Sequence, residues 1–119
     1  MDVETKNCFL KATATGTRSL QTVIDISKDL FAACADKKIK KVLVDIVSLD
    51  GHLSVMESFE FHTRHFPNIR NRNIINKCAI LDRKDNRQEY QIFETIAVNR
   101  GYTLNIFSDF NEAVAWLNR

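Results

Sequence analysis

The residues that could carry chemistry are concentrated between positions 48 and 65, which read SLDGHLSVMESFEFHTRH. This stretch contains all three histidines of the chain, His52, His62 and His65, together with Asp50 and Ser54. Imidazole and carboxylate groups are zinc ligands, and Ser, His and Asp are the residue types of an acyl-transfer triad. The stretch is therefore the first candidate for a metal centre or a catalytic site.

The spacing of the histidines argues against a zinc site. His62 and His65, at positions i and i+3, would need His52 or Asp50 as a third ligand to hold one ion. On a helix that begins near Val55, His62 falls at the edge of the apolar stripe and His65 lies further round toward solvent. We predict no metal and no cofactor, and we expect His62 to be a partly buried structural histidine.

Ser54 has a structural reading that competes with catalysis. A triad of Ser54, His52 and Asp50 would require one loop to orient all three side chains, and the sequence has no G-x-S-x-G elbow. Ser54 and Glu57 instead form the pattern S-x-x-E ahead of an apolar helix, which predicts a capping box. We predict no catalytic residue, and phosphorylation of Ser54 at an exposed helix start remains an alternative.

Strands and helices alternate along the chain that positions this stretch. Apolar and β-branched runs predict strands at 8–15, 41–47, 76–82 and 102–107. Apolar residues at helical spacing predict helices at 17–38, 55–66, 89–100 and 109–117. The alternation predicts one α/β domain over residues 1–119, a three-layer sandwich with a mainly parallel four-stranded sheet and four helices on both faces.

Two of these elements carry finer predictions. The continuous apolar run KVLVDIV at 41–47 indicates a central strand that is covered on both faces. The helix at 55–66 is expected to end at Pro67, which cannot continue it.

Ligands of parallel α/β sheets bind beyond the carboxyl ends of the strands, which makes this edge the expected functional rim. The rim comprises 16–17, 48–54, 82–86 and 108–109. On the helical wheel Val55, Phe59 and Phe66 form the buried stripe, and Phe61 falls on the polar side. An exposed Phe61 indicates a protein partner surface or a homodimer contact.

Composition narrows the classes of partner. The net charge is only +2, so no polyanionic partner is required globally. Residues 64–87 are locally basic but contain only Phe66 for stacking, which disfavours nucleic acid. No apolar run approaches the ~18 residues of a membrane span. The three cysteines form no C-x-x-C pair and are expected to be buried free thiols in the cytoplasm.

Three segments resemble the small bacterial SpoIIAA-like proteins, which are relatives of the STAS domain. They are ATATG before a helix, KVLVDIVSLDG, and FETIAVNRGYTLNIFSDFNEAVAWL. The resemblance implies a parallel core with strand order 2-1-3-4, an optional extra N-terminal strand, and a non-enzymatic binding or switching module of a signalling system. The bacterial antagonists of this family carry a phosphorylatable serine in a D-S-x-G motif. Here Gly51 follows Asp50, so Ser54 is the nearest positional counterpart.

The sequence therefore predicts a cytoplasmic STAS-like regulatory module rather than an enzyme. We expect it to bind a protein partner through Asp50, His52, Ser54 and Phe61. The alternative is a carrier of a lipid or another small apolar ligand, held in a pocket among the eight Phe side chains.

Overall fold

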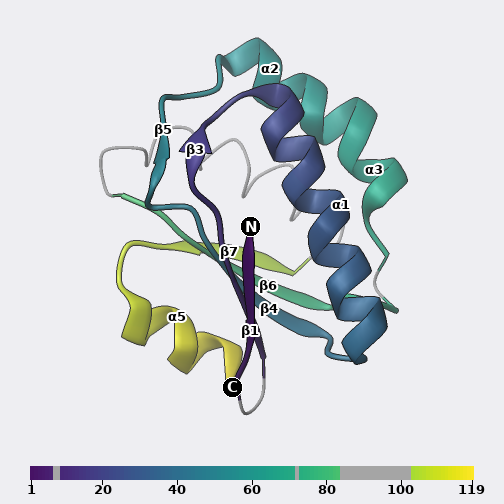
Figure 1. Ribbon diagram of the computed structural model, residues 1–119, viewed down its shortest axis with the longest axis vertical. Helices are drawn as coiled ribbons and strands as arrows, with labels where there is room; N and C mark the ends of the chain where they lie inside the picture. Colours follow the sequence, from purple (N-terminus) through teal and green to yellow (C-terminus); the bar gives the residue numbers. More distant parts are fainter. Residues whose placement is uncertain (7–8, 72, 84–102) are drawn as a thin grey trace.

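A five-stranded sheet forms the centre of the protein, whose computed structural model describes residues 1–6, 9–71, 73–83 and 103–119 (Figure 1). The strands are β1 (Asp2–Thr5), β2 (Leu10–Thr13), β4 (Lys41–Asp45), β6 (Lys77–Leu81) and β7 (Leu104–Phe107). β1 pairs antiparallel with β2, and the remaining pairings are parallel. The mainly parallel sheet and the extra N-terminal strand agree with the expectation. The helix expected at 89–100 lies outside the described residues.

The strand order differs from the one that the resemblance implied. The observed order is β1-β2-β4-β6-β7, so the core strands lie side by side in sequence order, and the expected order 2-1-3-4 is wrong. Val42 of β4 pairs with Leu10 on one side and with Cys78 on the other, which makes β4 a central strand. The apolar run at 41–47 predicted this position correctly, because a strand with two neighbours and two covered faces has no wet side.

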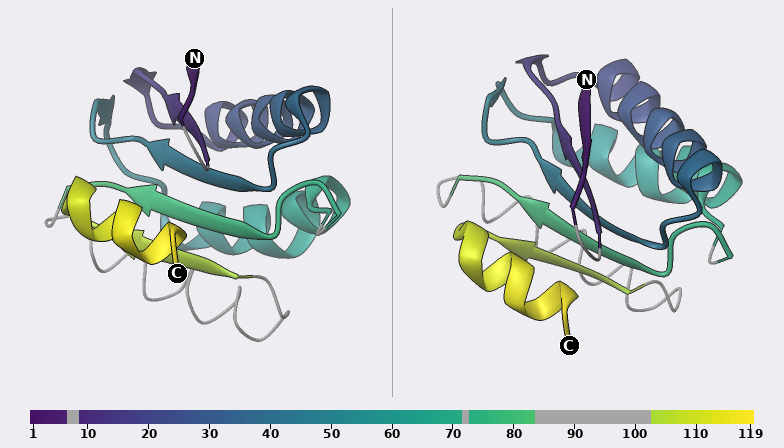
Figure 2. Two further views of the ribbon diagram at one scale, coloured as in Figure 1. Left: turned by 90° about the horizontal axis from the view of Figure 1, so that it is seen from below. Right: turned by 60° about the horizontal axis from the view of Figure 1, so that its bottom comes forward.

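Helices cover both faces of the sheet. α1 (Leu20–Lys37) and the continuous helical segment α2 (Val55–Glu60), η1 (Phe61–His65) and α3 (Phe66–Ile69) lie on one face, and α5 (Phe110–Leu117) lies on the other (Figure 2). The three-layer arrangement is therefore confirmed for the described residues. Consecutive crossovers that step in one direction across a parallel sheet place their helices on the same face, because each crossover is right-handed.

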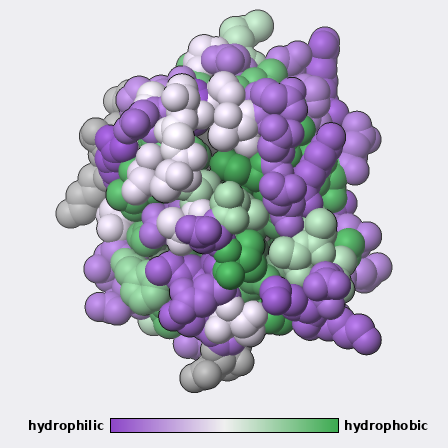
Figure 3. All heavy atoms as spheres, in the orientation of Figure 1, coloured by the Kyte–Doolittle hydropathy of each residue, from purple (hydrophilic) through white to green (hydrophobic). Residues whose placement is uncertain are grey.

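Each face of the sheet has its own apolar core, as the alternation of side chains along a strand requires. Val42 and Val44 of β4 point toward α1, where they join Leu30 and Phe31. Leu43, between them, points the other way and packs with α5 in a second cluster. The outward face of α1 is polar and is largely covered by hydrophilic side chains (Figure 3).

The helical segment after the rim does not end at Pro67, as was expected, but continues to Ile69. In an unbroken α-helix the ring of Pro67 would clash with the carbonyl group of Thr63, and the missing N–H would leave that carbonyl without its donor. The π turn η1 widens the helix immediately before the proline, with the Phe66 N–H donating to the Phe61 carbonyl group. A local change of helix type thus accommodates Pro67 without breaking the element.

A second, two-stranded sheet lies at the carboxyl ends of the main strands. β3 (Gly16–Thr17) pairs in parallel with β5 (Leu49–Asp50). The helix expected from residue 17 accordingly begins only at Leu20, with Ser19 as its N-cap. Among the described residues, no helix is both long and apolar enough to cross a membrane.

Candidate functional site

The rim at the carboxyl ends of the strands is held together by a buried ion pair between Arg18 and Asp82. The Arg18 Nη2 atom donates to Asp82 Oδ2 at 2.9 Å, and the two side chains are only 4% and 0% exposed. Arg18 Nη2 also donates to the Ile46 carbonyl group at 3.3 Å, and the Arg18 N–H donates to the Asp50 carbonyl group. Arg18, which lies between β3 and α1, therefore connects the loop after β4, β5 and the end of β6.

A second arginine fixes the same loop from the surface. Arg83 Nε donates to the Val47 carbonyl group at 2.8 Å, and its Nη2 atom lies 3.4 Å from Asp50 Oδ1. Asp50, which the sequence placed on the rim, is exposed and takes part in this ion pair. The loop that leads to α2 is thus anchored at several backbone positions, and it presents α2 in a defined orientation.

Ser54 caps α2 in the way that its spacing from Glu57 predicted. The Glu57 N–H donates to Ser54 Oγ at 3.1 Å, and the Ser54 N–H donates to Glu57 Oε1 at 3.0 Å. These reciprocal bonds form a complete capping box. Ser54 is exposed, so its hydroxyl group is accessible from solvent.

The buried face of the helical segment matches the expected stripe at Phe66, which packs against the core, but not at Val55 and Phe59. Phe61, predicted to be exposed, is 3% exposed, and His62, predicted at the edge, is 4% exposed. Ser58, one turn earlier, completes this inner face. The Phe61 ring contacts those of His62 and Phe66, with centroid distances of 4.9 and 5.5 Å. The expectation that Phe61 forms part of an exposed contact surface is therefore wrong.

Three apolar side chains of α2 point outward instead and form what we call the α2 face. Val55 is 66% exposed, Met56 is 78% exposed and Phe59 is 55% exposed. Their spacing puts them on one side of the helix. The helical wheel predicts Val55 and Phe59 on the buried stripe, and this prediction is wrong. The helix has apolar residues on two sides, and the wheel alone does not show which side packs on the sheet.

The three histidines occupy different environments. His52 is exposed, His62 is buried and His65 is half-buried. In the described part of the chain, no group of three His, Cys, Asp or Glu side chains is placed to hold a metal ion. Residues 48–65 thus supply part of the rim, a helix cap and an exposed apolar face.

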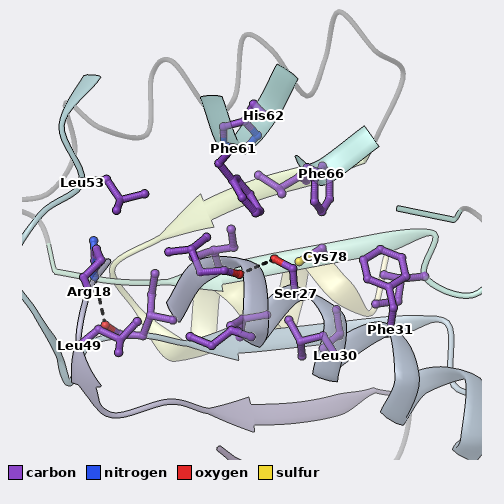
Figure 4. A pocket seen from close by; sticks show the side chains of 18 residues that line it. Arg18, Ser27, Leu30, Phe31, Leu49, Leu53, Phe61, His62, Phe66 and Cys78 are labelled. Carbon is purple, nitrogen blue, oxygen red and sulfur yellow. Dashed lines mark hydrogen bonds between the residues drawn. The ribbon is translucent and has the colours of Figure 1, made fainter. Parts of the chain in front are cut away.

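An apolar cavity of about 100 Å³ lies between the sheet, α1 and the π turn (Figure 4). Phe61, Phe66 and Phe31 approach it from the helices, and Leu49, Leu53 and Arg18 lie at one end (Figure 4). Its lining is almost entirely apolar, with Ser27, His62 and Arg18 as the polar side chains among the described residues. The Ser27 hydroxyl group already donates to the Val23 carbonyl group within α1.

Cys34 and Cys78 belong to the core on the α1 side of the sheet and are buried free thiols. Burial raises the pKa of Cys34 to about 11. Burial, together with the neighbouring Cys34, raises the pKa of Cys78 to about 12. Because the thiolate is the reactive form, both side chains behave as apolar core residues, as the sequence suggested. Cys8 lies outside the described residues.

The sequence missed the Arg18–Asp82 pair and the α2 face, and it expected an apolar pocket among the Phe side chains without locating it. Arg18 and Asp82 are far apart in the chain, and only the strand order brings them together. The cavity is formed by side chains from several elements, and no local pattern marks it. A weak signal did exist for the helix: Ser58, which is small, lies one turn before His62, and small side chains allow a helix to approach a sheet closely.

No protein-family model and no curated protein matches the sequence. Among solved structures, the chain is similar to an anti-sigma factor antagonist from Mycobacterium paratuberculosis, with a TM-score of 0.64, 10% identity, and coverage of 98% of this chain and 92% of that one. It is also similar to an uncharacterised protein with a SpoIIAA-like fold from Shewanella loihica, with a TM-score of 0.51, 22% identity, and coverage of 98% and 90%. The chain therefore has a SpoIIAA-like fold.

Proposed function

We propose that the protein is a non-enzymatic regulatory module that binds a protein partner through the α2 face. The observation that carries this proposal is the exposure of Val55, Met56 and Phe59 side by side on one short helix. A contiguous exposed apolar patch is costly in water and commonly marks a protein contact. The similarity in fold to an anti-sigma factor antagonist, a protein named for its action on another protein, supports the same class of function.

The surroundings of the α2 face favour a partner with an apolar socket and a mixed charged rim. Glu60 lies one turn beyond Met56, and its carboxylate is 3.8 Å from the Arg64 guanidinium group. Asp50 and His52, both exposed, precede the helix. Charged groups at the edge of an interface fix its register, and apolar side chains at the centre supply most of the binding free energy.

Ser54 is the residue at which this contact would be regulated. Its exposed hydroxyl group lies at the start of α2, directly before Val55 and Met56. Phosphorylation would add a dianion beside the apolar patch and close to the Glu57 carboxylate, which accepts the Ser54 N–H. The added charge would have to be desolvated in an apolar interface, so we propose that the phosphorylated protein releases its partner.

The proposal is tested by capture of partners on immobilised protein. We expect a Met56→Ser, Phe59→Ser variant to lose a partner that the unmodified protein retains, and a Ser54→Asp variant to bind it more weakly. The matched control is Val3→Ser, Phe110→Ser, which removes two exposed apolar side chains elsewhere on the surface. Identical partner profiles for all variants, with unchanged melting temperatures, would exclude the α2 face.

The cavity supports a second candidate function, the binding of a small apolar ligand. Native interiors contain few voids larger than a water molecule, and an apolar cavity stays dry. A void of about 100 Å³ is smaller than the engineered cavity of about 150 Å³ that binds benzene. It therefore suits a small apolar molecule or the end of an acyl chain rather than an entire lipid.

Native mass spectrometry distinguishes this second function from the first. A co-purified ligand adds mass, and Val44→Leu, which enlarges a side chain lining the cavity, should abolish that addition. Leu43→Met, on the opposite face of β4, is the control and should retain it. A clean apo mass, with no rise in melting temperature across a panel of small apolar compounds, would rule out the carrier function. The proposal of partner binding through the α2 face would not be affected by this result.

A further inference from the structure

A basic groove lies at the opposite end of the sheet from the rim, where the parallel strands begin. It has a volume of about 430 Å³. The polar side chains that line it are Thr5, Lys6, Lys38, Lys40, Lys41 and Asn76. Four of these six side chains are lysines, and no carboxylate from the described residues is among them.

The positive charges of this groove are poorly compensated. Lys6 pairs with Glu4 at 2.9 Å, but among the described residues no carboxylate lies within ion-pair distance of Lys38, Lys40 or Lys41. Lys41 also lies directly opposite Lys77 on the neighbouring strand. Burial lowers the pKa of Lys77, and repulsion from Lys41 and Arg119 lowers it further. Positive charge is therefore concentrated at this end of the sheet, although the net charge of the whole chain is only +2.

Stabilisation of the C-terminal end of α1 by positive charge explains only some of the lysines near the groove. A lysine in the last turn of a helix is stabilised by the negative end of the helix dipole, which accounts for Lys37. Lys40 and Lys41 lie beyond the helix, where this effect has fallen off. Lys38 has a φ of 57°, a left-handed conformation that glycine adopts with less strain. Lys38 is the C-cap residue of α1, which accounts for its backbone conformation but not for a charged side chain at this position.

We propose that this groove binds a ligand that carries two or more phosphate groups. Ammonium groups provide the charge, and the Asn76 amide and Thr5 hydroxyl groups are further donors to phosphate oxygens. A concave site suits a discrete anion, and no aromatic side chain of the described residues lines it to stack on a base. The phosphates belong either to a free polyphosphate or to a phosphorylated lipid headgroup.

The test is calorimetric titration with tripolyphosphate in a buffer without phosphate. We expect binding that weakens when salt is raised from about 50 to about 200 mM, because screening reduces the attraction between exposed charges. Lys38→Gln, Lys40→Gln should weaken it at least about fivefold. Lys28→Gln, Arg64→Gln removes two exposed positive charges away from the groove and should change it less than about twofold.

A second arm uses vesicles that contain phosphatidylinositol bisphosphate to identify the source of the phosphates. If the groove variant loses binding of tripolyphosphate but not of vesicles, the result supports a free ligand. If it loses binding of vesicles but not of tripolyphosphate, the result supports a lipid headgroup. If the protein binds neither probe, or if the control variant loses as much affinity as the groove variant, the groove is not a phosphate site. The α2 face plays no part in these measurements, so their outcome is independent of the proposed partner binding.

Discussion

Arg18 and Asp82 form a charge pair that is almost completely removed from water. Replacing Arg18 by Met should leave the Asp82 carboxylate buried with its main counter-charge absent. Removing one partner of such a pair typically costs about 3–5 kcal/mol in the free energy of unfolding. Urea denaturation measures this loss, and the rim loops that Arg18 joins should become accessible to proteolysis in the same variant.

The control for Arg18 uses an exposed pair. Arg64 and Glu60 are 3.8 Å apart, and the Arg64 side chain is 78% exposed, so Arg64→Met should cost no more than about 1 kcal/mol. The double variant Arg18→Met, Asp82→Leu should recover most of the lost stability, because no buried charge remains. A single Arg18→Met variant as stable as Arg64→Met would show that the buried pair contributes no more to stability than the exposed one.

Cys34 and Cys78 make stability depend on pH in the alkaline range. Their pKa values are raised from 9.0 in an exposed thiol to about 11 and about 12 in the folded protein. Above about pH 9 the unfolded chain loses these protons while the folded protein keeps them. The contribution to stability is therefore complete below pH 9 and is lost as the pH rises toward the folded pKa values.

Two measurements check the thiol prediction in a Cys8→Ser background. At pH 8 a thiol reagent should not react with the folded protein and should react with both remaining cysteines in denaturant. Urea midpoints should fall from about pH 9 to about pH 10.5 more steeply than in a variant that also carries Cys34→Ala and Cys78→Ala. Equal slopes in the two proteins would contradict the burial of the thiols.

At the scale of elements, the start of α2 could be predicted from the sequence, but its buried face could not. The S-x-x-E pattern predicted the capping box, because a cap depends only on neighbouring residues. The inner face of the same helix was not predictable, because Val55, Phe59 and Phe61 are all apolar and the packing of the helix on the sheet decides among them. The prediction that the helix ends at Pro67 was also wrong. The π turn before Pro67 lets the helix continue although the proline has no N–H to donate.

The cap itself yields a prediction about α2. Ser54→Ala should destabilise the protein by about 1 kcal/mol, because the Glu57 N–H loses its acceptor. Ser54→Asp retains a carboxylate acceptor and should cost much less. Thermal denaturation measures the difference. A Ser54→Asp variant as unstable as Ser54→Ala would mean that repulsion from the Glu57 carboxylate outweighs the cap, and reduced partner binding by Ser54→Asp would then need a separate explanation.

At the scale of the whole molecule, the sequence predicted the layers but not the order of the strands. The alternation of strands and helices is a local pattern, and it was sufficient for a parallel sheet covered on both faces. Strand order depends on which edges pair, and this is a long-range choice. The central position of β4 was nevertheless visible in its unbroken apolar run, whereas the order 2-1-3-4 placed the same strand at an edge.

Native-state hydrogen exchange tests the strand order directly. In the observed order β4 lies between β2 and β6 and is covered by a core on each face, so the amides of Val42, Leu43 and Val44 should exchange only through global unfolding. β1 is an exposed edge strand, and its amides should exchange through local fraying with a much smaller protection factor. The order 2-1-3-4 predicts the opposite ranking of amide protection for these two strands, because it places β2 between two neighbours and leaves β4 open along one edge. Faster exchange at Val42 and Val44 than at Leu10 and Ala12 would therefore overturn the observed topology, whereas protection that decreases from β4 through β2 to β1 would support it.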